Sequence, residues 1–344
     1  MALENKEKPP LYFVSAKVDY GLIGGATLAA WALLSSASSP GPAREAAALL
    51  SWVVNWPHFS ATSWRLYGSR SRWTQFPLTA LAVPPLLVLA AAGALASPLG
   101  FAPWFVKLFL IWSPYHFSGQ SLGLSMIYAR RAGFDPGRLG RAALSGFIFG
   151  TFLLGTARSE ASGESTPYFG IRCPSLGIPY WAPRAVEIGM WASGAVFLLV
   201  VLAWCLRSRR FLPPIVLLPA AAQWLWFVQG APRESFQAFV PFLHSLQYLL
   251  LAWSMQMAEG RATRETVWGK SAAWAAANVA GGAALFWALP WAASKLGYAR
   301  DFAEPVAISA VQLHHFFVDG VIWKLRDPRL ASPVRVHVPA LLAS

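Results

Sequence analysis

The sequence has few charged side chains. Lysine, arginine, aspartate and glutamate together make up 12% of its 344 residues, whereas hydrophobic residues make up 56%. Water-soluble domains usually carry about a quarter charged residues. Long apolar stretches recur along the whole chain, and only helices or closed barrels satisfy their backbone groups within lipid. The composition therefore excludes an ordinary soluble domain and predicts an all-α, polytopic transmembrane helix bundle.

Cysteine is also scarce, with Cys173 and Cys205 the two examples. We expect Cys173 in an outer loop and Cys205 near the cytoplasmic end of a span, so a disulfide between them is not expected. Neither cysteine has the spacing of a metal site. The start of the chain, MALENKEKPPLYF, lacks the pattern of a cleaved signal peptide. The first span is therefore expected to remain as an anchor.

Acidic residues are the minority among the charges, with 15 against 28 lysines and arginines. Most of the basic residues fall on one side of ten predicted spans, which is the side that faces the cytoplasm in membrane proteins. This distribution predicts both termini in the cytoplasm, a place in the cytoplasmic (inner) membrane, and contact with anionic lipid rather than nucleic acid. The spans are expected at about 19–37, 45–64, 76–97, 103–128, 141–157, 184–206, 211–229, 236–257, 271–294 and 304–323.

No second domain is indicated, so residues 1–344 are interpreted as a single integral membrane domain. Most connections between spans are short. The exception is 158–183, which is predicted to lie on the outer side and contains the aromatic run PSLGIPYW. Long loops in compact proteins often cover a site. This outer loop is therefore a candidate lid, with a disordered connector as the alternative.

Histidine occurs six times, and five of these residues lie in predicted spans: His58, His116, His244, His314 and His315. The sixth, His337, lies in the basic C-terminal segment. An ionisable group in hydrocarbon costs several kcal/mol unless it is paired, so such residues face the interior of a bundle. Imidazole is a common metal ligand. Histidines from four different spans therefore predict a shared metal site, although any one alone is more typical of a hydrogen bond between helices.

Each histidine has polar neighbours at helical spacing, three or four residues away. Imidazole ligands usually donate their second N–H to such groups. The residues expected to support the site are Asn55, Gln120, Gln247 and Gln312, and the candidate catalytic residues are Tyr248 and Asp319. Asp319 shares a helix face with His315, whereas His314 lies about 100° away. One of these two histidines is expected to be a ligand, and the other to lie beside the ligands or to face a substrate.

Four segments, "PHFSATS", "HFSGQS", "HSLQYL" and "HHFFVD", follow one another in the chain. Their order and spacing resemble the histidine motifs of the bacterial Brp/Blh-type carotene-cleaving dioxygenases, which are membrane proteins that use iron. The resemblance implies His58, His116, His244 and His314 as iron ligands, because the family offset from histidine to aspartate matches His314 to Asp319. This chain departs from the family at Ser63, Ser121 and Tyr248, where the family has two acidic residues and a second histidine.

These observations favour a membrane-embedded non-haem iron (Fe²⁺) oxidoreductase acting on a hydrophobic small molecule, either lipid-like or isoprenoid. Two alternatives stay open. Histidines on facing helices can hold haem through both axial positions. A buried polar centre can also serve a transporter or an assembly factor that is not an enzyme. The oligomeric state is not indicated by the sequence.

Overall fold

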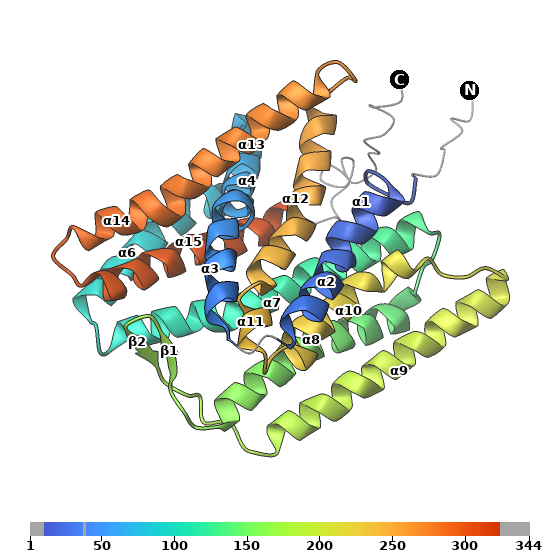
Figure 1. The fold of residues 1–344 in the computed structure, drawn as a ribbon, viewed down its shortest axis with the longest axis horizontal. Helices are drawn as coiled ribbons and strands as arrows, with labels where there is room; N and C mark the ends of the chain where they lie inside the picture. Colours follow the sequence, from blue (N-terminus) through green and yellow to red (C-terminus); the bar gives the residue numbers. More distant parts are fainter. Residues whose placement is uncertain (1–9, 37–38, 324–344) are drawn as a thin grey trace.

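The computed structural model describes residues 10–36 and 39–323, and within them the chain is a bundle of helices (Figure 1). The all-α prediction is confirmed, since the only sheet in the described residues is a two-stranded hairpin. The helical segments are α1 (Ala16–Tyr20), η1 (Gly21–Gly25), α2 (Ala26–Leu34), α3 (Gly41–Leu50), η2 (Ser51–Asn55), α4 (Trp56–Tyr67), α5 (Arg70–Gln75), η3 (Leu78–Ala82), α6 (Val83–Ala96), α7 (Phe101–Arg131), α8 (Gly137–Ala161), α9 (Ala182–Ser208), η4 (Pro214–Val216), α10 (Leu218–Trp224), η5 (Leu225–Gln229), α11 (Glu234–Gln237), α12 (Val240–Glu259), α13 (Val267–Ala283), η6 (Ala284–Ala288), α14 (Leu289–Ser294) and α15 (Arg300–Ile322).

Helical structure is present at each of the ten predicted spans. Six helical stretches of the described chain are long and apolar enough to cross a membrane: Leu78–Ala96, Gly137–Ala161, Ala182–Ser208, Glu234–Glu259, Val267–Ser294 and Arg300–Ile322. The chain thus has the character of a membrane protein, while ten crossings and cytoplasmic termini stay predictions. His337 and the basic residues of 1–9 and 324–344 lie outside the described residues.

Several helices contain one wide, π-helical turn: η1, η2, η3, η5 and η6. In three cases a proline follows two residues after the end of the wide turn. Pro57 follows η2, Pro84 follows η3 and Pro290 follows η6. Proline lacks an N–H group and its ring clashes with the carbonyl four residues earlier. A turn with wider hydrogen bonding gives that carbonyl room. The prolines therefore account for three of the wide turns while the helices continue.

The helices differ in how deeply they lie in the bundle. In the most apolar window of α15, 61% of the residues are buried, against 11% in α9. Figure 1 shows α9 along one edge against α8, and α13 with α14 along another edge, while α7, α12 and α15 pass through the middle. The apolar surface of the edge helices suits contact with lipid. The three helices in the middle carry His116, His244 and His315.

The predicted outer loop is partly ordered structure rather than loop. Helix α8 continues to Ala161, so residues 158–161 are helical, which corrects the predicted boundary. Strands β1 (Thr166–Tyr168) and β2 (Ile171–Cys173) follow as an antiparallel hairpin. The last turn of α8 carries Glu160, which pairs with Lys107 of α7 in the interior.

Glu160 also fixes the chain after the hairpin. Its carboxylate accepts a hydrogen bond from the Leu176 backbone at 2.7 Å, and its backbone carbonyl accepts one from Ser175 at 2.8 Å. The hairpin itself packs on α7 through Tyr168 and Phe109.

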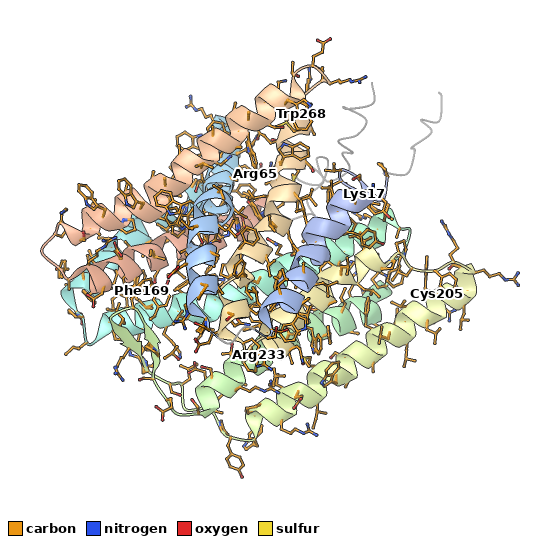
Figure 2. All side chains as sticks on the ribbon, in the orientation of Figure 1. Lys17, Arg65, Phe169, Cys205, Arg233 and Trp268 are labelled. Carbon is orange, nitrogen blue, oxygen red and sulfur yellow. The ribbon has the colours of Figure 1, made fainter. Side chains whose placement is uncertain are left out.

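In Figure 2, Phe169 at the hairpin and Cys205 of α9 lie far apart. Cys173 and Cys205 are both free thiols.

Candidate metal centre

Four helices each bring one histidine to a single point in the bundle. His58 comes from α4, His116 from α7, His244 from α12 and His315 from α15. Their rings form a closed cycle: centroids are 5.0 Å apart for His58–His244, 5.2 Å for His244–His116, 4.7 Å for His116–His315 and 4.5 Å for His315–His58. At most 2% of His58, His244 and His315 is exposed. The bundle therefore gathers imidazoles where water cannot solvate them.

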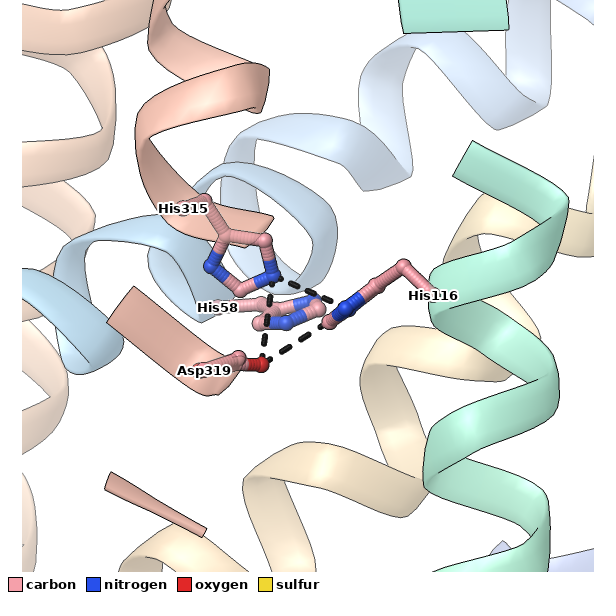
Figure 3. Close-up of side chains that lie close together, drawn as sticks. All are labelled: His58, His116, His315 and Asp319. Atoms are coloured by element: carbon pink, nitrogen blue, oxygen red, sulfur yellow. Dashed lines mark hydrogen bonds and ion pairs between the residues drawn. The ribbon is translucent and has the colours of Figure 1, made fainter. Parts of the chain in front are cut away.

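Asp319 completes this cluster from one helical turn beyond His315 (Figure 3). Its Oδ2 atom lies 3.4 Å from Nε2 of His315 and 3.6 Å from Nε2 of His116, and these two nitrogens are 3.1 Å apart. One ligand atom from each of His58, His116, His315 and Asp319 lies within 4.8 Å of the other three. Two ligands about 2.1 Å from a tetrahedral ion lie roughly 3.4 Å from each other. The separations among His116, His315 and Asp319 thus suit donors on one shared cation, and His58 lies close beside them.

Several buried nitrogens of the cluster have no hydrogen-bond partner among the described residues. They are Nε2 of His58, Nδ1 of His315 and both ring nitrogens of His244. Buried polar atoms are nearly always paired, because leaving one unpaired costs the free energy of its desolvation. Imidazole nitrogen and carboxylate oxygen together suit first-row transition metals. The cluster can therefore hold a metal ion, and His244 lies beside the other three histidines with its nitrogens uncommitted.

Hydrogen bonds from neighbouring helices fix the carboxylate. Oδ1 of Asp319 accepts from Thr62 at 3.2 Å, from Tyr248 at 3.4 Å and from the Trp323 indole at 3.1 Å. The hydroxyls of Thr62 and Tyr248 are themselves 2.5 Å apart. Trp323 lies four residues after Asp319, so helical spacing in the sequence could have identified it as a hydrogen-bond partner of Asp319. Because Oδ1 is fully occupied, Oδ2 is the oxygen left to face the histidines.

A second chain of hydrogen bonds orients His58. Its Nδ1 lies 2.9 Å from the Ser245 hydroxyl, which donates to the Asn55 side-chain oxygen at 2.9 Å. Asn55, expected beside His58 from its spacing, thus acts through Ser245. Sequence reasoning missed Ser245, because it adjoins His244 in the chain yet serves a histidine on another helix.

Three glutamines that were expected to support the imidazoles have other surroundings. Gln120 donates to the backbone carbonyl of His244 at 3.0 Å and to the side-chain oxygen of Gln247 at 3.4 Å. Gln247 donates to the carbonyl of Ile23 at 2.6 Å. Their amide groups thus tie helix backbones together instead of holding rings. Gln312 lines a cavity beside His58 and His315.

His314 lies outside the cluster. Its Nε2 atom is 3.0 Å from the hydroxyl of Tyr67, and the two rings stack with centroids 5.9 Å apart. Successive residues of a helix point about 100° apart, so His314 and His315 cannot both face one ion. Of the two adjacent histidines, the structure thus places His315 in the cluster, as the shared helix face with Asp319 indicated, and not His314, which the family resemblance implied.

Two cavities flank the cluster. The larger, about 420 Å³, lies between α7, α12 and α15 and is lined by His116, Tyr248 and Asp319 among others. The smaller, about 300 Å³, is lined by His58, His244 and His315 and also by Tyr168 of the hairpin. His116 borders both cavities. The centre can therefore be approached from two sides.

The fold and site together define an α-helical protein with membrane character and a buried histidine–aspartate cluster that can hold a metal. The sequence matches no protein-family model, and neither a curated protein nor a solved structure is significantly similar to it. The likeness to carotene-cleaving dioxygenases consequently stays an expectation from four short motifs.

Proposed function

We propose that this protein is a membrane-embedded non-haem iron oxidoreductase that acts on a lipid-like or isoprenoid substrate. One observation carries the proposal: ligand atoms of three histidines and Asp319 lie within 4.8 Å of one another, the His244 ring lies beside them, and several of their buried nitrogens have no partner among the described residues. Burying these groups costs several kcal/mol each unless something offsets the cost. A cation shared by all of them would do so. The positive-inside distribution of charge supports a place in the cytoplasmic membrane.

The donor set favours a redox metal held by nitrogen and oxygen. Sites of histidine and carboxylate with open positions are typical of non-haem Fe(II) oxygenases. When bound, iron would supply the capacity to react with dioxygen. Haem is the weaker alternative, because each of the four rings has two others within 5.2 Å, so they surround a space of ionic size instead of flanking a macrocycle.

The chain assigns distinct roles to the residues around the centre. His116 and Asp319 line the larger cavity, so they present the centre to a substrate there. Tyr248 lines the same cavity, and its hydroxyl lies within reach of Thr62 and Asp319. This position allows Tyr248 to donate a proton to, or accept one from, a group bound beside Asp319.

Elemental analysis and an absorption spectrum of the purified full chain test the proposal. Iron in stoichiometric amount without a Soret band is the expected result. A Soret band would replace the proposal with a haem protein, and failure to retain any metal after reconstitution with Fe²⁺ would favour a relay or transport role. The adjacent histidines offer a matched pair of variants. His315→Ala should lose the metal, whereas His314→Ala should retain it.

A further inference from the structure

The larger cavity has a mostly apolar wall with a few polar side chains. The polar ones are His116 and Asp319 of the candidate metal centre, together with Gln120, Gln247 and Tyr248. Aromatic and aliphatic side chains form most of the remaining wall, including Trp112, Leu124, Ile127, Leu251 and Phe316. A volume of about 420 Å³ is within the usual range for a small-molecule site. This distribution suits a ligand that is apolar along its length and reacts at one place.

Three glycines from two helices also line this cavity: Gly119 and Gly123 of α7 and Gly320 of α15. A Cβ atom added at any of them would meet no other atom within 4 Å. The glycines of α8 differ, because a Cβ at Gly146 would lie 2.6 Å from Ser193 and one at Gly150 would lie 2.8 Å from Met190, both on α9. Those two allow close helix packing, whereas the three cavity glycines leave space open.

The cavity opens at the surface of the bundle beside these glycines. Gly119 and Gly320 are both exposed, and 50% of the neighbouring Tyr115 is exposed. Gly119 lies near the middle of α7, and Gly320 lies in the last turn of α15. The surroundings of such an opening are lipid chains. A ligand that enters here therefore arrives from the bilayer.

We propose that this cavity receives a single extended hydrocarbon chain from the bilayer, between α7 and α15, and that Gly119, Gly123 and Gly320 set the width that is admitted. The reacting end of the chain would lie against His116 and Asp319, and this placement rests on the proposed function. An acyl chain and an isoprenoid chain share the chemistry that the wall recognises. The few polar groups in the wall would leave a polar ligand largely unpaired.

Photolabelling of the full chain in lipid nanodiscs tests this binding site. The probes are palmitic acid and geranylgeraniol, each carrying a diazirine, with and without an excess of the unlabelled compound. Labelling that the unlabelled compound removes is expected on the peptides that contain 112–127 and 316–323. Gly123→Leu should reduce this labelling by about tenfold, because a filled cavity rejects the chain. Gly189→Leu is the control, since Gly189 of α9 does not line this cavity and, like Gly123, has no atom within 4 Å of an added Cβ.

The two probes distinguish the sources of the chain. If only one probe gives labelling that its unlabelled compound removes, the site takes that kind of hydrocarbon chain, acyl or isoprenoid. If both probes do so, the site recognises the hydrocarbon character that the two chains share. Labelling that is not competed, or that is equal in Gly123→Leu and Gly189→Leu, would overturn the inference. Metal content is measured on the same samples. Competed labelling of a protein that never holds metal would uphold the binding site while refuting the proposed function.

Discussion

Replacing Asp319 with asparagine tests whether the carboxylate serves the metal. Asparagine has nearly the same shape, and its oxygen can still accept from Thr62, Tyr248 and Trp323, which occupy Oδ1 in the native chain. Its amide nitrogen then replaces Oδ2, at 3.4 Å and 3.6 Å from the nitrogens of His315 and His116. The variant should therefore fold, because its packing and three donors are preserved while one buried negative charge is removed.

The size of the effect separates two roles. Loss of a partner that only orients a ligand typically lowers metal affinity about 10- to 100-fold, or about 1.4 to 2.8 kcal/mol. The separations around Oδ2 match those of donors on one ion, and loss of a direct ligand should exceed that range. Competition with a chromogenic chelator in detergent measures the affinity, and thermal unfolding of the metal-free protein checks the fold. Metal affinity equal to that of the native chain would refute any role of Asp319 in binding.

A double-mutant cycle with His315→Ala identifies the partner of Asp319. Residues that act as one unit show non-additive changes in free energy. A double variant that binds metal little more weakly than His315→Ala alone would indicate that Asp319 acts through His315. Full additivity would instead indicate that Asp319 acts through His116 or on the ion by itself.

Three further outcomes follow from contacts elsewhere in the chain. Ser245→Ala should weaken metal binding about tenfold, because it removes the hydrogen-bond partner of the His58 ring. Ser254→Ala is the control and should leave metal binding unchanged, because the Ser254 hydroxyl bonds to the backbone of its own helix. Competition with the chromogenic chelator compares the two variants. Lys107→Met should lower the free energy of unfolding by about 3–5 kcal/mol, because it leaves the buried Glu160 without its cation. The double variant Lys107→Met, Glu160→Met should recover much of the lost stability, and thermal unfolding compares the two variants. Reporter fusions in the β1–β2 hairpin and after the C-terminus should report opposite sides of the membrane; the same side for both would refute the ten-span topology.

The sequence allowed the helices and the convergence of histidines to be predicted, because apolar runs and buried imidazoles each have few structural solutions. The face shared by His315 and Asp319 also follows from helix geometry alone. The destinations of the glutamines could not be predicted in this way. Gln247 reaches the carbonyl of Ile23 on a distant segment, and such a partner depends on how helices are placed side by side. Ser245 was missed for the same reason, since its partner is His58 rather than its neighbour in the chain.

The wide turn η2 divides the helical segment 41–67 into two registers. Residues 41–50 and 56–67 each follow ordinary helical spacing, but the turn between them accommodates one residue more than an α-helical turn does. One residue corresponds to about 100° of rotation. The wide turn absorbs that rotation, so a deletion of Val53 that converts it to an α-helical turn should leave Ala43, Ala47 and His58 on their present faces. A deletion or an insertion elsewhere in α4 would rotate the residues on one side of it, which makes this turn the position where the helix tolerates a change of length.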